Sequence, residues 1–140
     1  MLKVNVAIPV KLILTETTKQ QITSEINGAI QQVQNELEQI EFQGRAALND
    51  AEQNGNQAAV QAITGRMNQE RGVRMERREQ MMQQLVQIQQ TPLGSEVPGG
   101  QIETVVEVNV GDVWEDVVAG TEIVLKDGIV AEIRRGGGQA

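Results

Sequence analysis

The five residues Glu52-Gln53-Asn54-Gly55-Asn56 interrupt the longest regular pattern in this sequence and decide how the chain folds back. On each side, apolar or small residues recur every three or four positions, the spacing that lines up side chains on one helix face. They are Ile22, Ile26, Ile30, Val33, Leu37, Ile40, Gly44, Ala47 and Ala51 before the break, and Val60, Ile63, Met67, Met81, Leu85 and Ile88 after it. The pattern predicts a long antiparallel helical hairpin of coiled-coil type over 17–91, with its turn near 52–56.

The ends of this hairpin also leave signals in the sequence. Thr17 or Thr18 is a suitable N-cap for the first helix, and Thr91-Pro92 ends the second because a residue before proline avoids helical conformation. Gly55 suits the left-handed conformation in which helices commonly end. A reflection of the sequence about position 54 places Ala47 near Ile63 and Leu37 near Arg71. Small residues dominate the turn end, which predicts a slim tip of low stability.

Outward from the hairpin, apolar residues alternate as they do in strands. Residues 3–14 carry apolar side chains at every even position, and Pro9 on the opposite parity predicts an edge position or a bulge. Alternation returns at 102–110, and a last hairpin lies around Lys126-Asp127-Gly128. For it we expect a three-residue loop that pairs Leu125 with Ile129.

These strands are too few to be stable in separate pieces, so they should form one structure. We predict an α+β fold: a small antiparallel β-sheet or barrel, made of the N-terminal strand and about three C-terminal strands, with the long helical hairpin inserted. The predicted domains are a discontinuous β module of residues 1–15 and 93–135, the hairpin of 17–91, and a disordered tail at 136–140.

Composition narrows the possible chemistry. The 140 residues include 12 Lys and Arg, 19 Asp and Glu, and no His or Cys, for a net charge of −7. Nucleophilic catalysis by His or Cys, zinc sites built from these residues, and disulfides are therefore excluded. No segment approaches the roughly 20 apolar residues of a membrane span. We expect a cytoplasmic protein that contacts no membrane and needs no cofactor.

The chain resembles the YlqD family of small uncharacterised bacterial proteins over nearly its whole length. The resemblance rests on Pro92-Leu93-Gly94-Ser95-Glu96, on the stretch Val108-Asn109-Val110-Gly111-Asp112-Val113-Trp114, and on residues 124–134. The N-terminal strand and the Gln/Glu-rich helices are similar in style. The resemblance implies a fold and a cytoplasmic setting but no reaction and no catalytic residue. Because relatives are encoded beside ribosome-maturation genes, it also suggests a link to ribosome or RNA-processing machinery.

Basic residues at helical spacing in the second arm are the first candidate interface. Arg71, Arg74 and Arg78 could contact phosphates, but they face an arm that carries Glu36, Glu38 and Glu41. Pairing between the arms, which fixes their register, is the preferred interpretation. Direct nucleic-acid binding is disfavoured, because no aromatic residues interleave and the remaining surface is acidic.

Two further candidates lie at the turn and in the C-terminal part. Asp50 and Glu52 flank the hairpin tip, where the shape is analogous to transcript-cleavage factors that hold magnesium; ordinary polar residues at a turn are the simpler interpretation. Trp114 is an interface anchor if exposed, although we expect it to plug one end of the β module. The acidic residues of 103–116 are interpreted as a solvated face, and no metal ligands are predicted.

The sequence thus predicts a non-enzymatic interaction or adaptor module that presents a protruding helical hairpin to a protein or ribonucleoprotein partner. Two alternatives stay open: a carboxylate- and divalent-metal-dependent enzyme or regulator, and a self-assembling coiled-coil protein. Possible homodimer formation belongs to the second alternative, because a long isolated hairpin is marginally stable.

Overall fold

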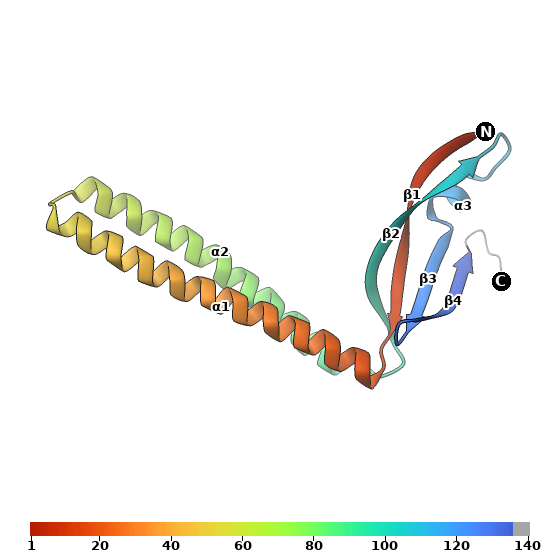
Figure 1. Ribbon diagram of the computed structural model, residues 1–140, viewed down its shortest axis with the longest axis horizontal. Helices are drawn as coiled ribbons and strands as arrows, with labels where there is room; N and C mark the ends of the chain where they lie inside the picture. Colours follow the sequence, from red (N-terminus) through yellow and green to blue (C-terminus); the bar gives the residue numbers. More distant parts are fainter. Residues whose placement is uncertain (136–140) are drawn as a thin grey trace. The chain divides into compact units, whose positions relative to one another are not determined.

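The computed structural model describes residues 1–135 and divides the chain into two compact units (Figure 1). One unit comprises Met1–Gln20 and the chain from Thr91 onward, and the other comprises Gln21–Gln90. The elements are β1 (Leu2–Ile13), α1 (Glu16–Gln53), α2 (Gln57–Gln90), β2 (Glu96–Val108), α3 (Trp114–Ala119), β3 (Thr121–Lys126) and β4 (Ile129–Arg135). The predicted α+β fold is confirmed, while the predicted tail at 136–140 lies outside the described residues.

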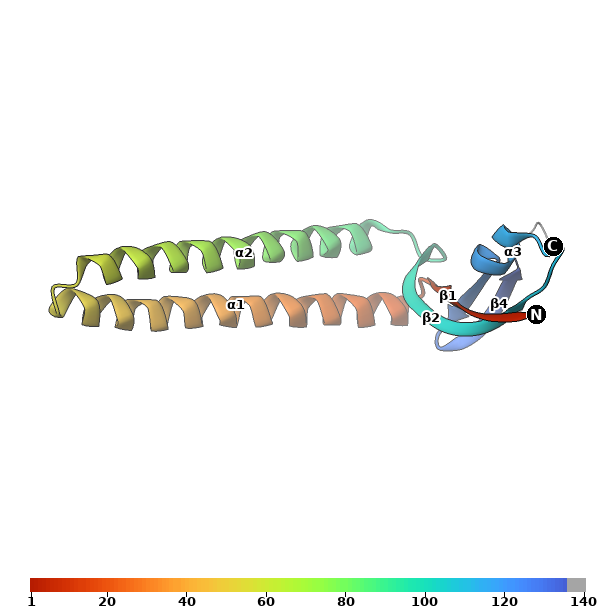
Figure 2. The same ribbon diagram turned by 90° about the horizontal axis from the view of Figure 1, so that it is seen from above.

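The helical unit is an antiparallel pair of 38- and 34-residue helices (Figure 2). Its turn satisfies the helix ends by backbone hydrogen bonds: Asn56 N donates to Ala51 O over 3.0 Å and Gly55 N donates to Glu52 O over 3.1 Å. Gly55 has a φ of +68°, so the turn is a Schellman motif. The side chain of Asn56 then caps α2 by accepting a hydrogen bond from Ala59 N.

Contacts between the two helices show where the chain folds back. Met67 fills the space left at Gly44, and the side chain of Arg78 reaches Gln34 over 3.1 Å. The first pair is centred between residues 55 and 56 and the second on residue 56, slightly later than the expected position 54, because α1 continues to Gln53 before the turn begins. The buried apolar side chains of the pair are Val33, Ala51, Met67 and Ile88.

The start of α1 differs from the prediction. Thr15, rather than Thr17 or Thr18, is the N-cap, and its Oγ1 accepts a hydrogen bond of 3.1 Å from Thr18 N. Asp127, from the turn between β3 and β4, accepts hydrogen bonds from the hydroxyls of Thr15 at 2.6 Å and Thr18 at 3.4 Å. Thr18 is therefore buried with a satisfied hydroxyl, and the first turn of α1 is tied to the sheet unit.

The four strands form one open sheet in the order β2-β1-β3-β4. β1 pairs antiparallel with β2 and parallel with β3, and β3 pairs antiparallel with β4. The expected composition of the sheet is confirmed, but the sheet is mixed and not closed into a barrel. β2 ends beside Leu2 at the start of β1, so the chain passes through α3 before β3 can run alongside β1 in the same direction.

Irregularities in two strand pairs set the register of the sheet. The pairing of β1 with β2 shifts between Pro9 and Lys11, which confirms a bulge at this proline although β1 is an inner strand. The β3–β4 loop has two residues, Asp127 and Gly128, with φ values of +51° and +80°. The expected three-residue loop is therefore wrong: a register shift between Val124 and Leu125 lets the shorter loop still place Ile123 opposite Ile133.

The sheet unit contains little buried apolar material. Among its described residues, Leu14 and Val124 are the fully buried large apolar side chains, and Val124 is 1% exposed. Many other apolar side chains of this unit are substantially exposed: Met1, Leu2, Leu93, Ile102, Val105, Val110, Val113, Trp114, Ile129, Val130 and Ile133. These exposed side chains are distributed over β1, β2, α3, β4 and the segments between them.

Candidate functional site

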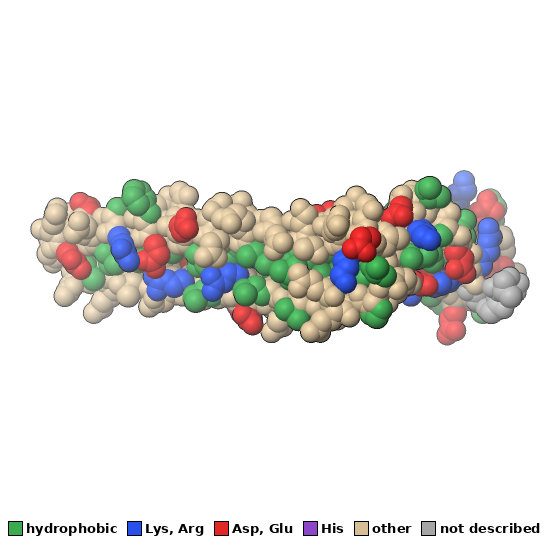
Figure 3. Space-filling model, turned by 90° about the horizontal axis from the view of Figure 1, so that it is seen from below, with side chains coloured by type: hydrophobic (Ala, Val, Ile, Leu, Met, Phe, Trp, Pro, Cys, Tyr) green, Lys and Arg blue, Asp and Glu red, His purple; other side chains and the backbone are tan. Residues whose placement is uncertain are grey.

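A charged layer crosses the middle of the helical hairpin. Arg71 on α2 forms an ion pair with Glu41 on α1, which also binds Arg45 at 3.3 Å. One turn further along α2, Arg74 Nε lies 3.7 Å from Glu36 Oε2, and Arg77 approaches the same oxygen at 3.9 Å. Figure 3 shows positive and negative side chains lying beside one another along the hairpin.

The structure thus brings Arg71, Arg74 and Arg78 together on α2, facing α1. Arg78 does not find a carboxylate, and it donates a hydrogen bond to Gln34 instead. Because these guanidinium groups already have partners across the seam and are only partly exposed, they are poorly available to phosphates. The interpretation that fits this geometry is a polar layer that fixes the register of the two helices.

Two open hollows lie beside the charged layer and share Ile40, Gln43 and Glu70. Gly44 and Met67 line one of them, and Glu36 and Arg74 line the other. Two atoms in this region, Glu36 Oε2 and Arg74 Nε, lie 3.7 Å apart and are buried without a hydrogen bond. The residues that line the hollows include no arrangement of a nucleophile and a base.

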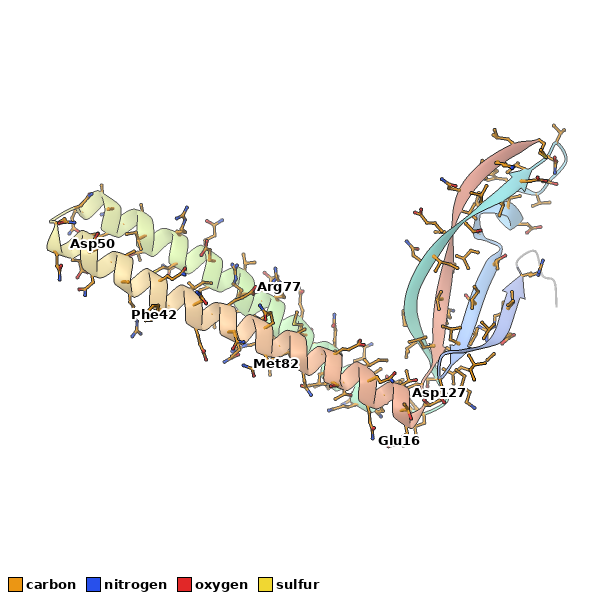
Figure 4. The ribbon with its side chains drawn as sticks, in the orientation of Figure 1. Glu16, Phe42, Asp50, Arg77, Met82 and Asp127 are labelled. Carbon is orange, nitrogen blue, oxygen red and sulfur yellow. The ribbon has the colours of Figure 1, made fainter. Side chains whose placement is uncertain are left out.

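Asp50 and Glu52 lie near the end of α1, and both side chains are exposed. Figure 4 shows Asp50 at the tip, remote from the charged layer. Within residues 1–135, no group of three or more acidic side chains is arranged to hold a metal ion. Glu103 and Glu107, also considered from the sequence, are exposed on β2. Carboxylates in such positions are well solvated and have little electrostatic coupling.

Trp114 belongs to the other unit and does not act as a plug. It is the first residue of α3 and 60% exposed, so the expected burial at one end of the β module is wrong. The physical reason is that the sheet stays open, so no barrel end exists for the indole to close. A largely exposed Trp instead has the properties of an interface anchor.

The exposed apolar side chains of the helical hairpin were not identified from the sequence. Phe42 on α1 is 78% exposed and points away from α2 (Figure 4). On α2, Met75, Met82 and Val86 are about half exposed and follow each other at intervals of seven and four residues. Such spacing places them on one side of the helix. The sequence contains a signal for their exposure: they are apolar residues that lie outside the apolar seam, so they do not face the other helix.

A second charged cluster, on the sheet, was also missed. Arg134 on β4 binds Glu96 on β2 through contacts of 2.5 and 2.7 Å, and it binds Glu122 on β3 at 2.9 Å. Lys11 on β1 completes the set by contacting Glu122 at 3.3 Å. Hydrogen bonds from Arg134 lower the pKa of Glu96 and that of Glu122 below the ordinary value, and Lys11 acts in the same direction on both.

This cluster connects all four strands and shares a face with the buried Val124. Val124 lies opposite Lys11 on β1 and Glu132 on β4, and Glu122 is two residues before it on β3. The aliphatic parts of long charged side chains readily cover apolar surface. We therefore interpret the cluster as the cover of this part of the small core. Sequence reasoning missed it because its members are scattered over residues 11–134.

None of the helices in residues 1–135 has the length and hydropathy needed to cross a membrane.

The chain is similar to known proteins in both sequence and structure. By sequence, it is 28% identical over 130 residues to the uncharacterized protein YlqD of Bacillus subtilis (strain 168), and the match covers 91% of this chain and 94% of that protein. By structure, it is similar to a crystal structure of a protein of unknown function from Synechococcus sp. WH 8102, with a TM-score of 0.87 and 25% identity over 96% of this chain and 95% of that one.

The family assignment rests on almost the full length of the chain. The model of the family described as "YlqD protein" matches residues 2–134, which include both the helical hairpin and all four strands. The resemblance inferred from the sequence over nearly the whole chain, with its specific motifs at 92–134, is thereby confirmed. This chain belongs to the YlqD family.

Proposed function

We propose that this protein is a non-enzymatic adaptor that binds a protein or ribonucleoprotein partner through the helical hairpin, in the cytoplasm. The observation that carries the proposal is the distribution of side chains on the hairpin. Arg71 and Arg74 are engaged between the two helices, whereas Phe42, Met75, Met82 and Val86 are exposed. An exposed helix face with apolar residues at helical spacing is a common means of docking into a partner's groove.

Two other functions have less support. A metal-dependent enzyme needs carboxylates that converge, and those of the described residues do not. Self-assembly through the arginine seam needs that seam to be available, whereas Arg71 and Arg74 pair with glutamates of the same chain. The adaptor therefore remains the function that the geometry supports best.

Side-chain substitutions in the full-length chain test the proposal without removing the hairpin. The doubly substituted Met75→Ser/Met82→Ser chain and the Phe42→Ser chain are each immobilised beside the wild-type chain, and captured proteins from a native bacterial lysate are quantified. We expect one protein or complex to be depleted by these substitutions. The matched control is Gln83→Ser, an exposed position on the same helix, which should retain it.

Circular dichroism must show unchanged helix content in each variant before the captured proteins are compared. Identical capture by all variants would contradict binding through these helix faces. The ribosome or RNA-processing machinery is the partner class that we propose to examine first, because the family resemblance suggests it. Cosedimentation of the wild-type chain with ribosomal particles, lost on Met75→Ser/Met82→Ser, is the expected result for that class.

A further inference from the structure

The chain leaves β2 through a rigid, outward-facing turn in the sheet unit. Asn109 N donates a hydrogen bond of 2.8 Å to Asp112 Oδ2, and Asp112 N donates one of 3.1 Å to Asn109 O. These two bonds close the turn and place Val110 at its outer end, where the side chain is fully exposed. An apolar side chain in such a position is held in place without being covered.

Several other exposed apolar side chains lie next to this turn. Val113 and Trp114 follow it directly, and Trp114 begins α3, which contacts β1. Leu2 pairs with Val108 at the end of β2, so the start of β1 lies beside the turn, as Figure 1 shows. We call this group the Trp114 patch, and its members are Met1, Leu2, Val110, Val113 and Trp114, each of them exposed.

The charged residues around the Trp114 patch are predominantly acidic. Asp112 lies within the turn, Glu115 and Asp116 follow Trp114 in α3, and Glu107 is near the end of β2; all four are exposed. Among the described residues, the nearby cations are Lys3, which lies opposite Glu107 in the β1–β2 pairing, and the amino group of Met1. The excess of negative charge therefore comes from Asp112, Glu115 and Asp116. The patch therefore has an apolar centre and a negative surrounding.

We propose that the Trp114 patch is a second docking surface, distinct from the helical hairpin, and that it binds a positively charged, amphipathic segment of a partner protein. The negative surrounding repels anionic lipid surfaces and nucleic acids, and it would face itself if two copies met through this patch. A basic protein segment with apolar side chains complements both parts. Trp is the residue most enriched among side chains that dominate binding energy, and the closed turn lowers the entropy lost on binding.

The chain offers a direct test, because Trp114 is its single Trp. A short synthetic helical peptide of Leu and Lys, and its Leu and Glu counterpart, are titrated into the full-length protein. We expect the Leu/Lys peptide to shift the Trp emission to shorter wavelength with saturation at one peptide per chain. The Leu/Glu peptide should leave the emission unchanged.

Variants separate specific docking from general attraction to an acidic protein. With a fluorescently labelled Leu/Lys peptide, Trp114→Ser should weaken binding by about tenfold or more, as loss of a dominant interface residue does. Glu115→Gln/Asp116→Asn should weaken it as well and reduce its dependence on salt. The matched control Asp50→Asn/Glu52→Gln removes the same charge at the hairpin tip and should bind the peptide as the wild type does.

Three results would overturn the proposal. The first is an equal loss of affinity in the tip variant and in the Glu115/Asp116 variant. The second is unchanged peptide binding by Trp114→Ser, with folding verified by circular dichroism. The third is that the Trp emission shifts with phosphatidylglycerol vesicles and not with the peptide, or that it shifts because the chains associate with one another, which sedimentation experiments would detect. Because every variant of this test is independent of Met75 and Met82, it stands apart from the test of the hairpin.

Discussion

Among single residues, Gly44 has a packing role that its position within a helix would not suggest. A Cβ added there would lie 2.4 Å from the Sδ of Met67, so the absence of a side chain lets Met67 enter the seam. Met67 is one of the few buried side chains of the helical unit. Glycine has a low helix propensity, and the packing of Met67 between the two helices compensates for this cost at Gly44.

We expect Gly44→Ala to be less stable than Gly28→Ala by about 1–3 kcal/mol, the usual cost of overpacking a well-packed site. Gly28 is the matched control, because a Cβ there meets no atom within 4 Å and alanine should raise helix stability by about 0.8–1 kcal/mol. Urea unfolding followed by circular dichroism measures both. Equal stability of the two variants would mean that Met67 moves aside without cost.

Arg134 is the second residue with a testable role, because it lowers the pKa of Glu96 and of Glu122. Carboxylates with a lowered pKa in the folded protein stabilise it above the ordinary value of about 4.3, and this contribution is lost as the pH falls through their folded-state pKa values. We expect Arg134→Met to lower the melting temperature at neutral pH. The difference from the wild type should begin to shrink as the pH falls below about 4.3, and it should disappear only below the lowered folded-state pKa values of Glu96 and Glu122, where both carboxylates are protonated.

The neighbouring Arg135→Met removes the same charge from an exposed position and serves as the control for this experiment. It should shift the melting temperature little at any pH. A deficit of Arg134→Met that is constant from neutral to acidic pH would show that the loss comes from packing of the side-chain stem and not from the ion pairs.

Among the elements, the α1–α2 hairpin should be unevenly stable along its length. Residues 46–65 next to the turn are mostly small or polar, whereas Val33 and Ile88 are buried in the other half. We expect backbone amides of 46–65 to exchange with solvent faster than those around Val33, because fewer apolar contacts oppose local opening. Hydrogen exchange measured by mass spectrometry resolves the difference.

Gly65→Ala provides a check on the hydrogen-exchange experiment. A Cβ at this position meets no atom within 4 Å, so alanine should slow exchange near the turn by raising helix propensity alone. Uniform protection along both helices of the wild type would contradict the expected weakness of the tip.

The elements also show how far the sequence predicts the structure. The two long helices and the four strands follow from the period of the apolar residues, a local property, whereas the short α3 was not predicted. The sequence offers several threonines as N-caps for α1; the contact that sets Thr15 apart is its bond to Asp127, in a turn 112 residues away. A two-residue loop with unbroken pairing would place Ile123 opposite Glu132, so the apolar pattern favours a longer loop. The register shift between Val124 and Leu125 instead sets Ile123 opposite Ile133, and the pattern does not contain this shift.

Candidate site residues were predicted unevenly for a related reason. The pairing of Arg71 and Arg74 with the opposite helix follows from helical spacing and opposite charges, so it could be inferred. Exposure of Trp114 could not, because it depends on whether the sheet closes. Burial of a side chain in so small a unit depends on how many strands form the sheet and in which direction they run. The period of the apolar residues does not specify either property.

In the whole molecule, the two compact units should unfold at different temperatures, because each has its own set of contacts. Circular dichroism at 222 nm reports mainly on the hairpin, and the fluorescence anisotropy of Trp114 reports on the sheet unit. We expect different midpoints from the two signals. Gly44→Ala should shift mainly the midpoint seen by circular dichroism, and Arg134→Met mainly the midpoint seen by fluorescence anisotropy. Coincident midpoints in the wild type and in both variants would show that the two units unfold together.

The position of β1 in the sheet has a consequence for how the chain folds as it is synthesised. β1 is made first, yet both of its neighbours, β2 and β3, are made only after the two long helices. Until then its row of apolar side chains has no partner strand, and closing so long a loop is entropically costly. Helices form quickly from local contacts, so pairing of α1 with α2 would bring Leu14 towards Ser95, where the structure has a 2.8 Å backbone hydrogen bond. The hairpin would then act as a folding aid, shortening the search by which the first strand finds the last ones.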